Sequence, residues 1–199
     1  MVIRLRRRPG SYPLNAFLVS TGIVALAEIG DKTQLLALVL ATRFRKPLPI
    51  ALGILFASLV NHALAGALGA WITSLIGPVA LRWMLGLSFI AMAIWTLVPD
   101  RLEAGKANAS HAGAFATTLV AFFLVEMGDK TQVATIALAA QYHAFVPVVA
   151  GTTLGMMLAN VPVVWLGERI TRRVPIRAVH VVSAAIFAVL GTVALLGAG

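Results

Sequence analysis

Long apolar stretches, separated by short polar, Pro- or Gly-containing segments, make up most of the chain. A membrane-spanning helix needs about 20 mostly apolar residues, and these stretches are long enough to supply them. They cover residues 14–41, 49–76, 79–98, 114–140, 146–166 and 178–196. The pattern therefore predicts an all-α polytopic membrane protein with six transmembrane helices joined by short connections.

Composition excludes several classes of protein. Hydrophobic residues make up 60% of the 199 positions and charged residues 12%, whereas a soluble domain carries roughly 25% charge. The net charge of +9 fits basic loops on the cytoplasmic face of a membrane. We therefore expect the chain to contact membrane lipid and not to bind nucleic acid. The chain has no cysteine, which excludes disulfides and thiolate metal sites.

One short motif occurs twice. Residues 28–34 read EIGDKTQ and residues 126–132 read EMGDKTQ, so six of seven positions agree at an offset of 98. The same offset relates further positions, namely Ala16-Phe17 with Ala114-Phe115 and Gly53 with Gly151. We interpret this as a duplication with three helices per half. Because three is odd, the second half enters the membrane from the opposite side, which predicts two inverted three-helix repeats of the kind found in secondary transporters.

This duplication sets the expected domain organisation. We expect a basic N-terminal segment at 1–13, a first repeat at 14–98, a central loop at 99–113 and a second repeat at 114–199. The basic leader and the apolar run ending in Ala25-Leu26-Ala27 also resemble a cleavable signal peptide. Cleavage there would destroy the first copy of the motif, and the second copy has no basic leader, so the repeat favours a retained first helix.

Both copies of the motif place charges in the middle of a predicted span. Each unpaired charge there costs about 2.5–3.5 kcal/mol, so the charged side chains are expected to converge. The predicted metal ligands are the four acids of the motifs, Glu28, Asp31, Glu126 and Asp129. With the two motif lysines they carry a formal charge of −2, which suits one divalent cation. Oxygen ligands favour Ca²⁺, Mg²⁺ or Mn²⁺, and protons compete for the same oxygens.

Neighbouring polar residues are expected to add oxygens or to balance charge. They are Lys32, Thr33, Gln34, Asn61, Lys130, Thr131, Gln132 and Asn160. Hydrogen bonds that merely pack helices are an equal alternative for the two asparagines, and His62 is expected to be a packing partner rather than a proton relay. Gly30 and Gly128 are expected to interrupt their helices and free backbone carbonyls as further ligands. A competing interpretation makes each Glu–Lys pair at i, i+4 a structural salt bridge, but it does not explain the aspartates.

The doubled E-x-G-D-K-T motif and the stretch GTTLGMMLANVPVVWLG at 151–167 support a resemblance over essentially the whole chain. The chain resembles the cation/proton exchanger family that includes the Golgi transmembrane protein 165 and bacterial manganese exporters. This resemblance implies export of Mn²⁺, or of Ca²⁺, from the cytoplasm across a bacterial plasma (inner) membrane in exchange for protons. By the same likeness, the functional positions are the Glu, Asp and Lys residues of both motifs.

Two other functions stay open at this stage: a membrane scaffold or regulator whose buried charges are structural, and an exporter of small organic solutes. We expect no enzyme and no cofactor, because no catalytic triad, phosphate-binding glycine loop or redox pair occurs in the sequence. Homo-oligomerisation is left open. Nine Lys and Arg lie in the odd-numbered connections and five on the other side, which predicts a cytoplasmic central loop, although the N-terminal arginines argue for the opposite orientation.

Overall fold

The computed structural model describes residues 12–98, 113–167 and 176–197. These residues form helices and connections without a strand, which confirms the all-α prediction for the described chain. The helices are α1 (Tyr12–Glu28), α2 (Lys32–Phe44), α3 (Pro47–Leu75), α4 (Pro78–Thr96), α5 (Gly113–Glu126), α6 (Lys130–Tyr142), α7 (Phe145–Leu166) and α9 (Ile176–Leu196). The basic N-terminal segment and nearly all of the predicted central loop lie outside the described residues.

Helix ends recur at the offset found in the sequence. α1 and α5 end at the glutamates of the two motifs, and α2 and α6 begin at the lysines. The residues directly after α2 and α6 are Arg45 and His143, and both adopt the left-handed conformation, with φ of 51° and 50°. Few non-glycine residues adopt this conformation, so its recurrence 98 residues apart shows that both halves form the same local structure.

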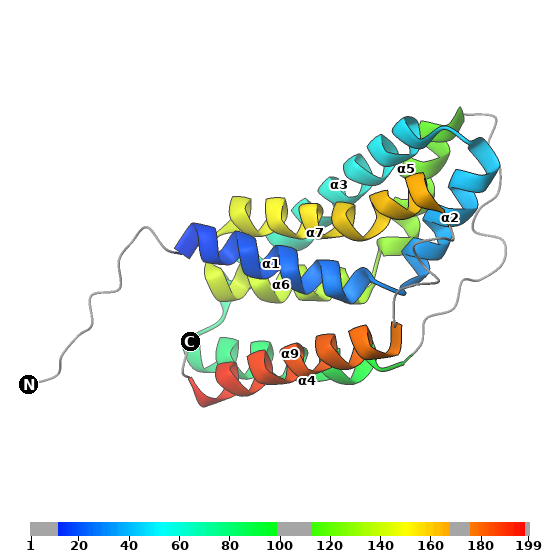
Figure 1. The fold of residues 1–199 in the computed structure, drawn as a ribbon. Coiled ribbons are helices and arrows are strands. Elements are labelled where there is room, and N and C mark those ends of the chain that lie inside the picture. The colour runs from blue at the N-terminus through cyan, green and yellow to red at the C-terminus, as the bar shows by residue number, and fades with distance from the viewer. Residues whose placement is uncertain (1–11, 99–112, 168–175, 198–199) are drawn as a thin grey trace, which may run out of the picture.

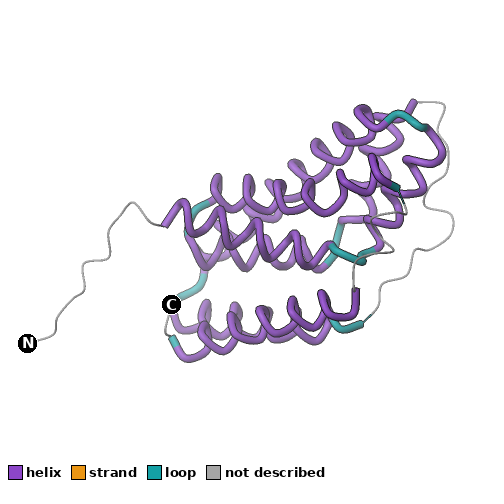
Figure 2. The backbone as a smooth tube through the Cα atoms, viewed as in Figure 1, coloured by secondary structure: helices purple, strands orange, loops and turns teal. Residues whose placement is uncertain are grey.

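The predicted first and fourth helices are each two helices in the structure. The stretch 14–41 divides into α1 and α2, and 114–140 into α5 and α6, because the chain turns sharply at each motif (Figure 2). The other four stretches correspond to α3, α4, α7 and α9, which are long and apolar enough to cross a membrane. α1 and α5 are apolar but shorter.

The helices pack in two layers (Figure 1). α4 and α9 lie side by side in one layer, and they contact the other helices mainly through α6 and α1. In the second layer, α1 packs along α7 and α5 packs along α3. Glycines allow these close contacts: a Cβ atom on Gly53 would lie 2.7 Å from Thr118 Cβ, and one on Gly151 would lie 3.0 Å from Ser20 Cβ. These two contacts are equivalent in the two halves.

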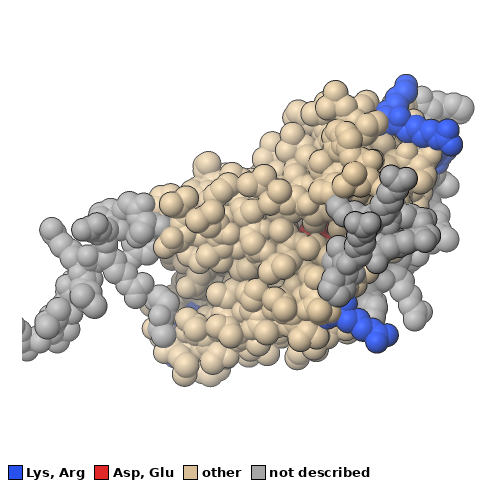
Figure 3. Space-filling view, viewed as in Figure 1, with Lys and Arg blue, Asp and Glu red and all other residues tan. Residues whose placement is uncertain are grey.

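Apolar side chains both fill the interior and cover the outside. Phe89 and Phe187 stack between α4 and α9 with ring centroids 6.3 Å apart. Outward-facing side chains such as Trp71 and Ile94 are 59% and 65% exposed. Figure 3 shows a face almost free of charge, with the coloured Lys and Arg gathered toward one end. A surface of this kind is suited to contact with lipid.

Candidate functional site

A tight turn joins α1 to α2 inside the first motif. Gly30 has φ of 84°, a conformation that side chains disfavour, and the Asp31 amide donates to the Glu28 carbonyl at 3.1 Å. The Gly30 amide donates to Gln34 Oε1 at 2.9 Å. The backbone therefore bends sharply over three residues, and the motif glutamine fixes the turn.

The second motif repeats this turn between α5 and α6. Gly128 has φ of 79°, and the Asp129 amide donates to the Glu126 carbonyl at 3.1 Å. The Gly128 amide donates to Gln132 Oε1 at 2.8 Å. Sequence reasoning treated the glutamines as auxiliary ligands, whereas the structure shows their amide oxygens accepting backbone hydrogen bonds. The turn in each motif also removes the glutamate and the lysine from the common helical face on which the i, i+4 salt-bridge interpretation depends.

Each motif threonine holds its own glutamate. The Thr33 hydroxyl donates to Glu28 Oε2, and the Thr131 hydroxyl donates to Glu126 Oε2 at 2.9 Å. Both glutamates are fully buried, and the Oε1 atom of each has no hydrogen-bond partner among the described residues. Each glutamate thus keeps one carboxylate oxygen in the interior that is available to a cation or a proton.

Two ion pairs cross between the motifs. Lys32 Nζ lies 2.8 Å from Asp129 Oδ1, and Lys130 Nζ pairs with Asp31 Oδ1. The interpretation in which Glu28 pairs with Lys32 is therefore wrong for this structure, because each lysine pairs with the aspartate of the other half. The two pairs differ in burial: the Lys32 side chain is 22% exposed and the Lys130 side chain is fully buried.

Three of the four predicted metal ligands come together. Glu28, Glu126 and Asp129 each offer one carboxylate oxygen, and these oxygens all lie within 4.8 Å of one another. Ligand oxygens about 2.3–2.6 Å from a Ca²⁺ ion can be at most about 5 Å apart, so one hard divalent cation fits the spacing. Asp31, the fourth predicted ligand, is held by Lys130 and lies outside this group.

Of the two predicted asparagines, Asn61 links two helices and Asn160 is bonded within its own helix. Asn61 Nδ2 on α3 donates to the Phe123 carbonyl on α5 at 3.1 Å, and Asn160 Nδ2 donates to the Met156 carbonyl within α7 at 3.1 Å. Both amide oxygens are buried without a hydrogen-bond partner among the described residues. His62 Nδ1 lies 3.3 Å from Thr153 Oγ1, a contact between α3 and α7 that suits a packing role.

Sequence reasoning missed the contribution of α9. A Cβ atom on Gly30 would lie 3.2 Å from His180 Nε2 and would overlap Ile176, so the N-terminal end of α9 sits on the first turn. A Cβ atom on Gly128 would meet nothing within 4 Å. No motif marks His180 or Ile176 in the sequence, because their position follows from the packing of the α4–α9 layer.

Comparison with known proteins assigns the sequence of this chain to a family. A family model described as "Divalent cation/proton antiporter GDT1" matches residues 16–104 and 114–199. A Vibrio cholerae protein named "Putative manganese exporter" is 48% identical over 180 residues, which cover 90% of each chain. GDT1-like protein sll0615 of Synechocystis is 30% identical over 193 residues, covering 87% of this chain and 93% of that protein.

A plant relative is GDT1-like protein 4 of rice (Oryza sativa subsp. indica), which is 31% identical over 168 residues, covering 71% of this chain and 59% of the rice protein. No solved structure matches the chain. The family is one of membrane transporters, so the chain is a transporter and not an enzyme, as the sequence predicted. Because the family model covers both halves, the chain belongs to the GDT1 family of divalent cation/proton antiporters.

Proposed function

We propose that the chain exports a divalent metal ion from the cytoplasm in exchange for protons, with Mn²⁺ as the first choice and Ca²⁺ as the second. The observation that carries the proposal is the buried group of three carboxylates, in which Glu28 comes from the first motif and Glu126 and Asp129 come from the second. Oxygen ligands at this spacing select hard divalent cations. The Vibrio relative, whose name includes manganese export, favours Mn²⁺.

The charges of the site suggest how metal and protons exchange. The two crossed ion pairs balance Asp31 and Asp129, so the glutamates supply the remaining formal charge of −2. One divalent cation neutralises that charge, and so do two protons. We expect the site to open to the other side of the membrane only when it is electrically neutral. It therefore carries either one divalent cation or two protons but not both, which couples the two fluxes.

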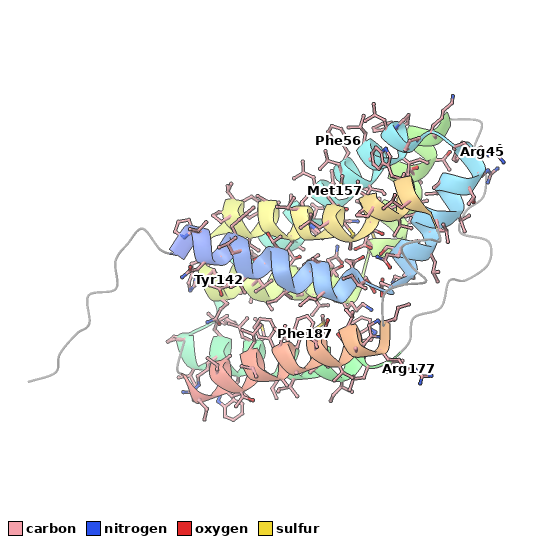
Figure 4. The ribbon with its side chains drawn as sticks, in the orientation of Figure 1. Arg45, Phe56, Tyr142, Met157, Arg177 and Phe187 are labelled. Carbon is pink, nitrogen blue, oxygen red and sulfur yellow. The ribbon has the colours of Figure 1, made fainter. Side chains whose placement is uncertain are left out.

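The two motifs also suggest a transmembrane arrangement. We assign residues 14–98 and 114–199 to two inverted repeats, in which α1 with α2, and α5 with α6, each form one broken span. In support, the starts of α1 and α4 and the ends of α6 and α9 line one cavity, as expected if they share one side of the membrane. Arg45 and Arg177 both lie toward the opposite end, one in each layer (Figure 4).

We place the central loop, 99–113, on the cytoplasmic side of the inner membrane, because the basic residues on that side then agree with the positive-inside rule. A reporter that is active only in the cytoplasm is therefore expected to be inactive when it is fused to the C-terminus. Activity of the fusion would reverse the orientation and leave the metal site untouched.

The transport proposal is tested in proteoliposomes that contain a pH-sensitive dye. Addition of Mn²⁺ or Ca²⁺, each alone, is expected to drive proton movement with the wild-type protein. Glu28→Gln and Glu126→Gln each remove one glutamate charge and are expected to abolish the signal, because the metal loses a ligand and the proton loses its carboxylate.

Arg45→Gln serves as the control, since it removes an exposed charge far from the motifs. Thermal melting and gel filtration of each variant separate loss of transport from loss of fold. If both glutamine variants keep metal-driven proton movement, the carboxylates are structural, and this result favours the scaffold interpretation. If an organic solute but neither metal drives proton movement, the solute-exporter interpretation replaces the proposal.

A further inference from the structure

A cavity of about 990 Å³ separates the two layers at one end of the molecule. Its lining comes from α1, α4, α6 and α9, and Tyr142, labelled in Figure 4, marks that end. The cavity is distinct from the carboxylate group, because neither motif contributes to the lining.

Polar residues line this cavity only near the helix ends, whereas apolar residues line it along its whole depth. The polar lining residues lie at helix ends: Asn15 and Arg82 are near the starts of α1 and α4, and Gln141, Tyr142 and His143 are at the end of α6. The lining one or two turns farther into the helices is apolar and includes Phe89 and Leu138, both almost fully buried. The cavity is therefore amphipathic along the helix axes.

Arg82 sets the sign of the charge at the polar end. It is the one Lys or Arg among the described lining residues, and no Asp or Glu lines the cavity there. Its Nε atom is buried without a hydrogen-bond partner among the described residues. Two helix N-termini and two helix C-termini meet at this end, so their partial charges of about half a unit cancel. Beside the imidazole of His143, the guanidinium is the permanent charge, and it makes this end positive.

A vestibule for the transported cation would be lined differently. Arg82 repels a divalent cation, and the apolar depth offers no ligand oxygen to replace its hydration shell. An anion with an apolar tail satisfies both parts of the cavity: its phosphate accepts hydrogen bonds from the guanidinium, and its acyl chain packs beside Phe89 and Leu138.

From this lining we infer that the cavity between α1, α4, α6 and α9 is a binding site for an anionic phospholipid, whose phosphate is held by Arg82. The lipid then fills the space between the α4–α9 layer and the rest of the bundle at this end. The site needs no metal, so it is independent of the transport proposal.

The experiment measures lipid binding to the full-length protein purified in neutral detergent. Palmitoyl-oleoyl phosphatidylglycerol is the probe, and native mass spectrometry counts retained lipid while thermal melting reports stabilisation. Wild-type protein is expected to retain phosphatidylglycerol in preference to phosphatidylcholine. Arg82→Gln is expected to weaken phosphatidylglycerol binding by about five- to tenfold, the contribution of one Arg–phosphate contact near a membrane surface.

Arg177→Gln is the matched control, because it removes the same charge from the exposed start of α9 and should leave binding unchanged. Arg82→Lys keeps the positive charge and is expected to keep the preference for anionic lipid. It therefore distinguishes loss of charge from misfolding as the cause of weaker binding by Arg82→Gln. Glycerol phosphate, which has the head but no chain, is expected not to stabilise the protein. Equal binding of phosphatidylcholine, equal stabilisation by glycerol phosphate, or unchanged binding by Arg82→Gln would each overturn the inference.

Discussion

The two motifs are almost identical in sequence but differ in their surroundings. Both form the same turn, the same Thr–Glu hydrogen bond and the same kind of ion pair. The first turn is covered by Ile176 and His180 of α9, whereas the second meets nothing around Gly128. Lys130 is fully buried and Lys32 is partly exposed.

This difference shows where the symmetry of the molecule is broken. The layer formed by α4 and α9 packs against α1 and α6, on one side of the paired motifs. The motifs themselves supply matched chemistry, and the α4–α9 layer decides which of them is covered.

Loss of the buried lysine is expected to have the largest effect on stability. Lys130→Gln removes the cation that pairs with the buried Asp31, and breaking a buried pair from one side costs about 3–5 kcal/mol. Lys32→Gln also leaves a buried aspartate unpaired, but the partly exposed Lys32 position admits water, so it is expected to cost less, about 1–3 kcal/mol. Thermal melting in detergent measures both losses.

The double variant Lys130→Gln with Asp31→Asn tests the cause. It removes both charges and is expected to recover most of the lost stability. Equal destabilisation by the two lysine variants would show that burial does not distinguish the two half-sites.

Substitution of the turn glycines is expected to have the next largest effect. Gly30→Ala and Gly128→Ala both place a side chain at positive φ, which costs about 1–2 kcal/mol. Gly30→Ala additionally overlaps Ile176, so it is expected to cost more than Gly128→Ala. The comparison uses thermal melting of the two variants.

Adding Ile176→Ala to Gly30→Ala removes the overlap and should bring the two turns to a similar stability. If Gly30→Ala and Gly128→Ala already have the same melting temperature without Ile176→Ala, α9 does not cover the first turn in the purified protein.

The smallest difference is expected between the motif glutamines. Gln34 donates to the Ala159 carbonyl on α7 at 2.9 Å and also holds the Gly30 amide. Gln132 holds the Gly128 amide. Gln34→Met is therefore expected to cost about 1 kcal/mol more than Gln132→Met, the contribution of one hydrogen bond. Thermal melting of the two variants measures the difference, and equal losses of stability would show that the bond from Gln34 to Ala159 contributes nothing.

Much of this arrangement could be predicted from local sequence. The apolar stretches located the helices, and the glycines beside the acids indicated where the first and fourth stretches are interrupted. Local sequence indicates where helices lie and where they are interrupted, because helix length depends on nearby side chains and a positive φ favours glycine.

The pairing of the charges could not be predicted in the same way. Spacing along the chain suggested Glu28 with Lys32, but the turn at Gly30 takes them off a common face, and Lys32 meets an aspartate 97 residues away. Likewise, the contact of His180 with the first turn depends on how two layers pack. Both features are tertiary, and a single sequence contains no direct signal for them.

The crossed ion pairs also constrain how the protein is made. When the ribosome has delivered the first motif to the membrane, the side chains that will neutralise Asp31 and Lys32 have not yet been synthesised, because they lie in the second half. The nascent first half must therefore wait at the insertion machinery, or keep its motif near water, until its counterpart arrives. Separately expressed halves should accordingly be short-lived alone and persist when they are produced together.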